Sequence, residues 1–202
     1  MFEGGDGRHR ALRRWPVPLA VALVCAALAL GGDTLRELLR YERLAIEQGE
    51  LWRLVGAHFV HLGAGHTVLN LAALAVLAFL FDEALDSLDW TAAVLASALA
   101  INAGLYWHAS GVAWYVGLSG VLHGVMVAGG IRLSAARAPI GPVLLVLTAA
   151  KLAWERWGGP LPGSELASGG PVITEAHLYG AVGGGAALAL LALVRRRGFR
   201  PV

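Results

Sequence analysis

The sequence predicts an all-α fold: a polytopic membrane protein whose six transmembrane helices form one bundle. Hydrophobic residues make up 57% of the 202 residues, and the mean hydropathy of +0.63 is too high for an ordinary water-soluble domain. The apolar residues fall in long runs between charged segments. About 20 apolar residues cross a bilayer core as a helix, because a helix satisfies its own backbone hydrogen bonds there.

Six apolar runs are candidate spans, which cover approximately residues 17–32, 65–81, 90–107, 119–133, 140–153 and 173–194. Residues 33–53 are charged and amphipathic, and we expect them to lie in or on the membrane interface. The glycine- and proline-rich residues 158–171 cannot continue a helix. They form either a plain connector or a mobile gate.

The distribution of arginine and lysine predicts the orientation of the chain. With the N-terminus in the cytoplasm, the inner side receives two basic tails, residues 1–14 and 195–202, and fewer basic residues fall outside. Both termini are therefore expected to be cytoplasmic, with residues 15–194 forming one helical domain. We expect the first run to be an uncleaved signal anchor, because further spans follow it.

The composition excludes several kinds of partner and cofactor. The net charge of +2 and the lack of clustered lysine give no footprint for nucleic acid. Cys25 is the only cysteine, so the chain has no internal disulfide and no thiolate metal cluster. The lipid bilayer is the partner that the composition predicts.

Polar residues inside apolar runs are the candidates for chemistry, because such groups are costly in lipid. Ser119 lies between glycines at the start of the fourth run. His66 and Asn70 lie in the second run and His177 in the sixth, so that the serine and both histidines enter from the outer side. A serine beside glycine can be a simple packing residue. Together, a hydroxyl, an imidazole base and oxyanion donors at one depth predict a serine protease site inside a membrane.

Small residues on two helices are expected to bring the serine and the base together. Gly120 and Gly124 follow the serine, and Gly180 and Gly184 follow the histidine, in each case at four-residue spacing. Faces of small residues let helix backbones meet closely. The fourth and sixth helices should therefore pack tightly, with His177 as the general base.

Two other residues compete for a role beside the base. His123 lies one turn after Ser119, and it is either the base itself or, as we favour, a residue that packs against His177 and orients it. Glu175, two residues before His177, points to another part of its helix. No carboxylate lies deep in any predicted span. We therefore expect a catalytic dyad and not a triad.

Oxyanion donors are expected from two elements. The backbone N–H of Ser119 lies at a helix start, where free N–H groups favour an anion, and Gly117 and Leu118 precede it as supporting residues. His66 and Asn70 are four residues apart and share one helical face. Loss of one such donor typically costs about 3 to 4 kcal/mol of transition-state stabilisation.

The remaining polar residues have structural interpretations. Asn102 is expected to connect two helices through a hydrogen bond. Trp52 and Arg53 suit an interfacial belt. Three further histidines are expected near the interface in structural roles, namely His58, His61 and His108.

Four motifs in this order resemble the rhomboid intramembrane serine proteases, over nearly the whole chain from residue 15 to residue 194. They are Trp52-Arg53 in the first loop, His66-x-x-x-Asn70 in the second helix, Gly117-Leu118-Ser119-Gly120 at the nucleophile with Gly124 after it, and Ala176-His177-Leu178-Tyr179-Gly180 at the base. Each motif alone is weak. Their order, each on the expected span, makes the resemblance specific.

The resemblance implies a compact six-helix bundle without cofactor or metal, in which a water-filled cavity opens to the outside. It implies that Ser119 attacks, that His177 is the base, and that the second-helix histidine and asparagine hold the oxyanion with the Ser119 backbone. It assigns orienting or packing roles to Trp52, Arg53, Gly120, Gly124, Gly180 and Gly184. Many family members carry a tyrosine four residues after the serine, stacked on the base, whereas this chain has His123.

Within the family, residues 117–124 and 176–181 are most similar to the rhombosortases. That similarity implies a bacterial inner membrane protein that cleaves membrane-anchored proteins with a C-terminal Gly-Gly motif, a transmembrane segment and a basic tail. One alternative is a general rhomboid protease with other substrates. Another is a catalytically silent rhomboid-like binder of membrane proteins. A channel or transporter is disfavoured, because the polar residues gather at one outer depth and line no path across.

Overall fold

The computed structural model describes residues 15–197, and side chains up to residue 195, so the predicted tail 1–14 and most of 195–202 lie outside the described residues. The long helices are α2 (Pro16–Ala29), α6 (Ala64–Leu80), α7 (Ser87–His108), α8 (Ser119–Ala135), α9 (Ile140–Gly158) and α11 (Thr174–Arg197). The short elements are α3 (Gly32–Leu39), β1 (Tyr41–Glu42), α4 (Arg43–Glu47), α5 (Arg53–Gly56), β2 (Trp114–Tyr115) and α10 (Ser164–Ser168). Each predicted run forms one long helix, so the all-α prediction is confirmed.

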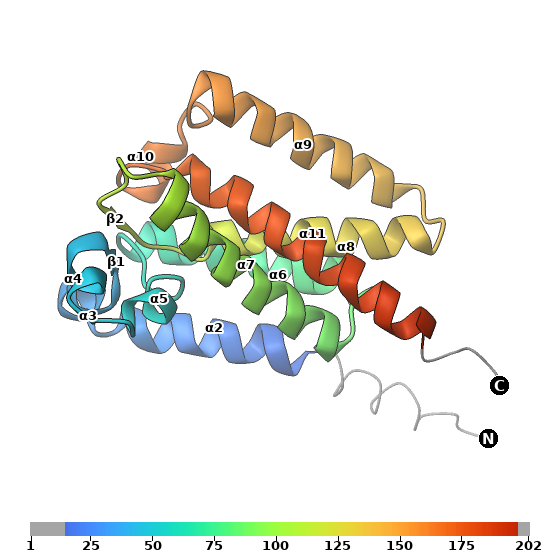
Figure 1. The fold of residues 1–202 in the computed structure, drawn as a ribbon, viewed down its shortest axis with the longest axis horizontal. Helices are drawn as coiled ribbons and strands as arrows, with labels where there is room; N and C mark the ends of the chain where they lie inside the picture. Colours follow the sequence, from blue (N-terminus) through green and yellow to red (C-terminus); the bar gives the residue numbers. More distant parts are fainter. Residues whose placement is uncertain (1–14, 198–202) are drawn as a thin grey trace.

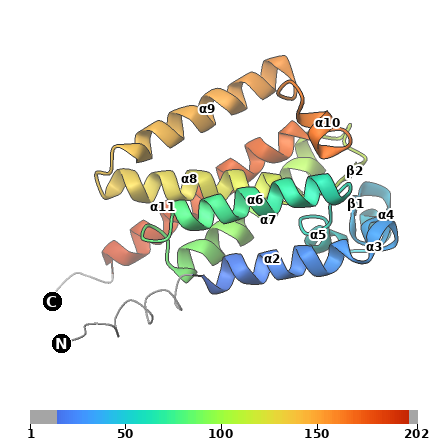
Figure 2. The ribbon, with the colours of Figure 1, turned by 180° about the vertical axis from the view of Figure 1, so that it is seen from behind.

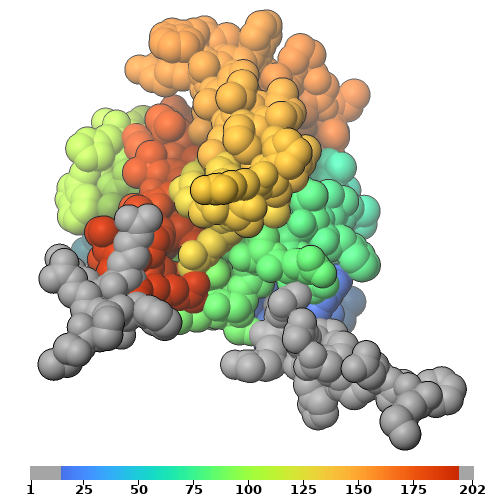
Figure 3. Space-filling view, turned by 90° about the vertical axis from the view of Figure 1, so that its right-hand side faces the viewer, coloured from blue at the N-terminus to red at the C-terminus, as the bar shows by residue number. Residues whose placement is uncertain are grey.

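The long helices form a bundle in which α11 and α7 lie on the near face, in front of α8 and α6 (Figure 1). Helix α11 packs most extensively against α7 and α8, whereas α2 lies against α6 and α7. From behind, α6 runs beside α8 (Figure 2). Helix α9 packs mainly on α8 and stands at the periphery, which the end-on view shows clearly (Figure 3). The bundle therefore has a tight centre and one outlying helix.

Length and composition identify fewer membrane crossings than the sequence analysis predicts. Two of the described helices, Ser87–His108 and Thr174–Arg195, are long and apolar enough to cross, and α2 with α3 forms a third candidate bent by 116°. Helices α6 and α8 have 17 residues each, or about 26 Å at 1.5 Å per residue, which is shorter than a hydrocarbon core of roughly 30 Å. The prediction of six crossings is therefore not established.

Apolar side chains nevertheless cover the outside of the bundle. Val76 on α6, Leu99 on α7 and Leu190 on α11 are each more than 60% exposed, and Val146 on α9 is similar. A soluble protein rarely exposes a continuous apolar surface of this kind, because water disfavours it. This surface suits the hydrocarbon core of a membrane.

The segment predicted to lie at the interface forms α3, β1, α4 and α5. Strand β1 pairs antiparallel with β2, with Tyr41 opposite Tyr115, and both tyrosines are buried. The Arg53 side chain is also buried and donates hydrogen bonds to the carbonyl oxygens of Glu37, at 2.7 Å, and Arg40, at 3.1 Å. The strand pair, which the sequence analysis did not predict, fastens the chain just before α8 to this first loop.

An ion-pair network closes the opposite end of the bundle. Asp89, near the start of α7, accepts hydrogen bonds from the Arg132 guanidinium of α8 at 2.5 and 3.1 Å. Arg195 of α11 contacts Asp89 and also Asp86, the latter at 2.9 Å. The charged ends of three helices are thereby joined.

One predicted boundary near the site is wrong. Helix α9 continues past its predicted end at residue 153 to Gly158, and residues 158–171 contain the short helix α10. Gly163 and Gly169 flank α10 with positive φ values of 80° and 77°, which glycine adopts without strain. Polar residues at the end of α9 led us to place its boundary too early.

Candidate active site

Ser119 is the first residue of α8, and two backbone hydrogen bonds fix the turn that leads into it. The Gly117 N–H donates to the Ala57 carbonyl oxygen at 2.9 Å, and the Leu118 N–H donates to His61 Nε2 at 3.4 Å. Burial lowers the pKa of His61 to about 4, so its ring stays neutral and can accept this bond. Gly117 has a φ of +120°, and a Cβ there would lie 2.8 Å from the His66 ring. Only glycine fits this turn without strain.

The predicted contact between the serine-bearing and histidine-bearing helices is present. A Cβ added at Gly180 would overlap the Gly120 carbonyl, and one added at Gly184 would overlap the Gly124 carbonyl. The backbones of α8 and α11 therefore touch along one line of glycines. This contact sets the separation between Ser119 and the side chain one turn before Gly180.

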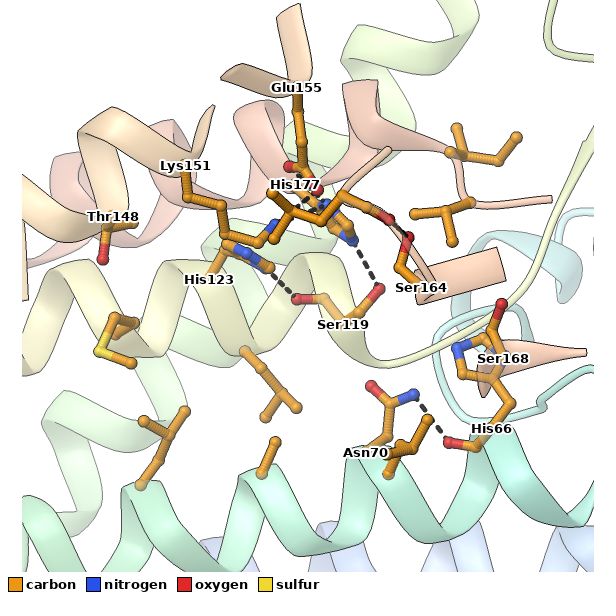
Figure 4. A pocket seen from close by; sticks show the side chains of 18 of the residues that line it. His66, Asn70, Ser119, His123, Thr148, Lys151, Glu155, Ser164, Ser168 and His177 are labelled. Atoms are coloured by element: carbon orange, nitrogen blue, oxygen red, sulfur yellow. Dashed lines mark hydrogen bonds and ion pairs between the residues drawn. The ribbon is translucent and has the colours of Figure 1, made fainter. Parts of the chain in front are cut away.

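His177 is that side chain, and it reaches the serine directly. Its Nε2 lies 3.0 Å from Ser119 Oγ, and the residue is 5% exposed (Figure 4). The distance lies within the range that proton transfer between a nucleophile and its base requires. The structure thus brings the predicted nucleophile and base together.

His123 stacks on His177, with ring centroids 4.2 Å apart and planes inclined by 20°. Its Nδ1 lies 2.7 Å from the Ser119 carbonyl oxygen. A carbonyl oxygen only accepts, so this nitrogen carries the proton. His123 is therefore bonded to the backbone of the serine and not to its hydroxyl, which favours the packing role over the alternative in which it is the base.

A carboxylate that the sequence analysis missed completes the surroundings of His177. Glu155 on α9 places Oε2 2.9 Å from His177 Nδ1, and its other oxygen accepts a hydrogen bond from Lys151 at 2.6 Å. The expectation that no carboxylate reaches the histidine is wrong, because α9 extends past residue 153. Glu175, the acid considered there, is exposed. The signal was the Lys151-x-x-x-Glu155 spacing, which puts both on one helical face.

His66 and Asn70 line the other side of the serine from α6 (Figure 4). The Leu62 N–H donates to His66 Nδ1 at 3.3 Å, so that Nε2 carries the ring proton. The Asn70 side-chain amide donates to the His66 carbonyl oxygen at 3.0 Å and has a second N–H. Both residues therefore have a donor available for an anion beside Ser119.

The two residues before the serine do not have such a donor. The N–H groups of Gly117 and Leu118 are bonded to Ala57 and His61, so they support the turn and cannot also hold an oxyanion. Ser119 begins α8, and the first N–H groups of a helix have no acceptor within it. Its N–H is the backbone donor that the helix leaves for an anion.

A cavity of about 580 Å³ lies beside Ser119, and its lining includes His66, Asn70, His123, Glu155 and His177. Ser119, His177 and Glu155 lie at its polar end, and α10 supplies Ser164 and Ser168 there. Away from this end the lining is mostly apolar and includes Val76 on α6, Met126 on α8 and Leu147 on α9. The cavity is large enough for several residues of an extended peptide.

The comparison with known families agrees with this geometry. The profile described as Rhomboid domain matches residues 48–194, which is most of the chain. The chain belongs to the rhomboid family. Rhomboid proteins are generally intramembrane serine proteases that act on membrane proteins within the bilayer, and this one is an integral membrane protein with a protease-like architecture. A search of curated proteins found no match to the chain.

The rhomboid site also contains three groups that ligate metals in other proteins. Donor atoms of His123, Glu155 and His177 lie within 4.8 Å of one another. The two imidazole rings are stacked nearly parallel, so their in-plane lone pairs run side by side and do not converge. The Lys151 ammonium also lies 3.3 Å from His177 Nδ1. The cluster does not fit a metal ion.

Other residues singled out from the sequence lie away from the rhomboid cavity. Trp52 is half exposed and donates to the Leu38 carbonyl oxygen, next to Arg53 in the first loop. Asn102 donates to the Leu54 carbonyl oxygen at 2.8 Å, which is the helix-connecting role predicted for it. The Trp52 bond lies within the first loop, and the Asn102 bond joins that loop to α7.

Proposed function

We propose that this rhomboid protein is an active intramembrane serine endopeptidase with Ser119 as nucleophile and His177 as general base. The observation that carries the proposal is the 3.0 Å contact between His177 Nε2 and Ser119 Oγ inside a cavity. A silent binder has no need for this contact. The family as a whole, which consists generally of serine proteases, points the same way.

Acylation begins when Ser119 Oγ attacks the carbonyl carbon of the scissile bond and its proton passes to His177 Nε2. The oxygen of the tetrahedral intermediate takes the negative charge, and the Ser119 N–H, His66 Nε2–H and Asn70 amide donate to it. The C–N bond then breaks, and Nε2 gives its proton to the leaving amine. An acyl-enzyme on Ser119 and a new N-terminus are formed.

Deacylation repeats these steps with water. His177 Nε2 takes a proton from a water molecule, the hydroxide attacks the ester carbonyl, and the same donors hold the oxyanion. The C–O bond to Ser119 breaks, and Oγ recovers the proton from Nε2. The products are a carboxylic acid and the regenerated enzyme.

The finer assignment is that the substrates are single-span membrane proteins cleaved near the outer face. All six long helices cross the bilayer with both termini in the cytoplasm, and the membrane is the bacterial inner membrane. Substrates end in a Gly-Gly motif, a transmembrane segment and a basic tail. The stacked pair of His123 and His177 occupies space beside Ser119, which favours small residues before the scissile bond.

The first experiment treats the purified protein in detergent with a fluorophosphonate probe. The wild type is expected to be labelled, Ser119→Ala to show no labelling, and His177→Ala to react at least about 10²-fold more slowly. His108→Ala, which changes an exposed histidine at the end of α7, is the matched control and should react as the wild type does. Absence of labelling in folded wild-type protein contradicts the proposal.

The second experiment tests the substrate in proteoliposomes. A reporter that ends in Gly-Gly, an apolar helix and an arginine tail should be cleaved by the wild type and not by Ser119→Ala. A matched reporter with the two glycines replaced by leucines should be cleaved at least about tenfold more slowly. Equal cleavage of both reporters leaves a rhomboid protease but removes the Gly-Gly assignment.

A further inference from the structure

We propose that Glu155 is a positioning residue that selects the productive tautomer of His177, and that Lys151 holds this carboxylate in place. The inference deepens the proposed function, since it rests on His177 being the base. It adds a third member, from α9, to the pair formed by α8 and α11. The nitrogen of His177 that carries the proton decides whether the ring can act as a base toward Ser119.

Two groups of opposite character compete for His177 Nδ1. The Glu155 carboxylate lies at 2.9 Å and can only accept a hydrogen bond, whereas the Lys151 ammonium lies at 3.3 Å and can only donate one. If Glu155 accepts, Nδ1 is protonated and the Nε2 lone pair faces Ser119. If Lys151 donates, the proton sits on Nε2 and the ring cannot act as a base. The shorter contact selects the productive form.

Lys151 supports the productive tautomer because its ammonium group is hydrogen-bonded to Glu155 and does not donate to His177 Nδ1. The ammonium donates to Glu155 Oε1 at 2.6 Å, one turn away on the same helix, while Oε2 faces the histidine. The Glu155 side chain is only 4% exposed, so its negative charge needs this partner. Each carboxylate oxygen thus has its own donor.

The other ionisable groups around His177 do not replace Glu155. His123 from α8 stacks on the ring, and His66 from α6 faces the same cavity. Glu175, on the same helix as His177, is exposed. Among the side chains that the structure describes, Glu155 is the only acid in contact with the imidazole. An imidazolium formed during catalysis therefore has this carboxylate to stabilise it.

The test uses an isosteric variant, Glu155→Gln, which should lose activity because it imposes the unproductive tautomer on His177. In Glu155→Gln, Lys151 should attract the amide oxygen, which turns the amide NH2 toward His177 Nδ1. The NH2 then donates to Nδ1 and imposes the wrong tautomer. In the double variant Lys151→Ala/Glu155→Gln, the amide is free to turn its oxygen toward Nδ1. Removing the lysine should therefore restore activity that the glutamine has removed.

The tautomer of His177 that each variant favours predicts its kcat and KM. In full-length protein in proteoliposomes, Glu155→Gln should lower kcat by about 10² to 10⁴-fold with KM little changed. The double variant should recover at least about tenfold, and Glu155→Asp, which keeps an acceptor, should exceed Glu155→Gln. Glu175→Gln is the matched control and should behave as wild type.

The outcomes separate this inference from the function on which it rests. Folding of each variant is checked by its melting temperature in detergent. If Glu155→Gln does not fold, Glu155→Asp carries the test: its shorter side chain lies farther from His177 Nδ1, so kcat should fall with KM little changed, and a kcat equal to that of the wild type overturns the inference. A folded Glu155→Gln within about threefold of wild type overturns the inference. So does a double variant that is no better than Glu155→Gln. If Ser119→Ala cleaves as fast as wild type, the proposed function fails and the inference fails with it.

Discussion

The two ends of the helix bundle both bury acids with cations, but in different ways. At one end, which we call the ion-pair end, Asp89 is bonded to the guanidinium groups of Arg132 and Arg195. At the other, the site end, Glu155 is bonded to Lys151 and to the His177 imidazole. Arginine is always protonated in proteins, whereas an imidazole gains and loses a proton near neutral pH. The first arrangement fixes charge for structure, and the second permits proton transfer.

Neutralising each buried acid separately should produce the largest effects. Asp89→Asn leaves Arg132 without its partner and should lower the free energy of unfolding by about 3 kcal/mol, with kcat per folded molecule unchanged. Glu155→Gln should do the reverse, with a large loss of kcat and a smaller loss of stability. Unfolding in mixed micelles and kcat normalised to probe-labelled sites measure both. A folded Asp89→Asn protein without activity would show that the two ends are coupled.

Lowering the pH should reduce the free energy of unfolding by about as much as Asp89→Asn does. Burial lowers the pKa of His58, in the loop after α5, from 6.5 to about 4. The unfolded chain therefore takes up a proton at a higher pH than the folded chain does, so this contribution is complete above pH 7 and is lost between about pH 6.5 and 4. The shift corresponds to about 3 kcal/mol, and His61, with a pKa also about 4, acts in the same direction.

The measurement for this prediction is the melting temperature across that pH range. His58→Leu should make the dependence less steep, because it removes one of the buried histidines that oppose protonation, whereas His108→Leu at an exposed position should leave it unchanged. An identical slope in His58→Leu and wild type would rule out His58 as the source.

Alanine substitution in the glycine contact between α8 and α11, which lies between the two ends, should change the stability by a smaller amount. Gly184→Ala places a methyl group against the Gly124 carbonyl and should cost about 1 to 3 kcal/mol, with lower kcat because α8 and α11 move apart. In the neighbouring Gly185→Ala, the new methyl group meets only side-chain atoms, of Val127 at 3.3 Å and Ile131 at 4.0 Å. This variant should be neutral or slightly stabilising, since alanine favours a helix. Equal melting temperatures for the two variants would contradict the close packing.

The smallest effect is expected at the edge of the ion-pair end. Trp15 donates from its indole N–H to Asp82 at 2.7 Å, across the start of α2 and the end of α6. Trp15→Phe removes this bond and should lower stability by about 1 kcal/mol. The rate of probe labelling at Ser119 should not change, because the site lies at the opposite end. A slower rate would show that strain is transmitted along the bundle.

The parts of the fold that could be predicted from the sequence are the long helices, because a chain in lipid must satisfy its own backbone hydrogen bonds. A long apolar run has few alternatives to a helix, so the cores of α6, α7, α8 and α11 were placed correctly. Ser119 and His177 stood out because polar groups in such runs are costly. The glycine spacings on α8 and α11 explained how they meet.

The missed features depend on tertiary contacts or on a single boundary. The two-residue strands β1 and β2 exist only because the chain ends of two loops pair, and no local pattern of two residues predicts this. Glu155 was missed because the predicted span ends at residue 153, so that Lys151 and Glu155 were not considered as a pair near the site. They are instead paired inside the bundle, where Lys151 and His177 satisfy the carboxylate. The engagement of the Gly117 and Leu118 N–H groups likewise appears only in three dimensions.

The shape of the cavity has a consequence for small-molecule inhibitors. Reactive groups gather at one end, and Val76, Met126 and Leu147 line the remainder with hydrocarbon. A compound with an electrophilic head and a short aliphatic tail would match both halves, with the tail gaining about 0.8 kcal/mol for each methylene it buries. Potency should therefore rise with tail length until the hydrocarbon pocket is full, and then level off.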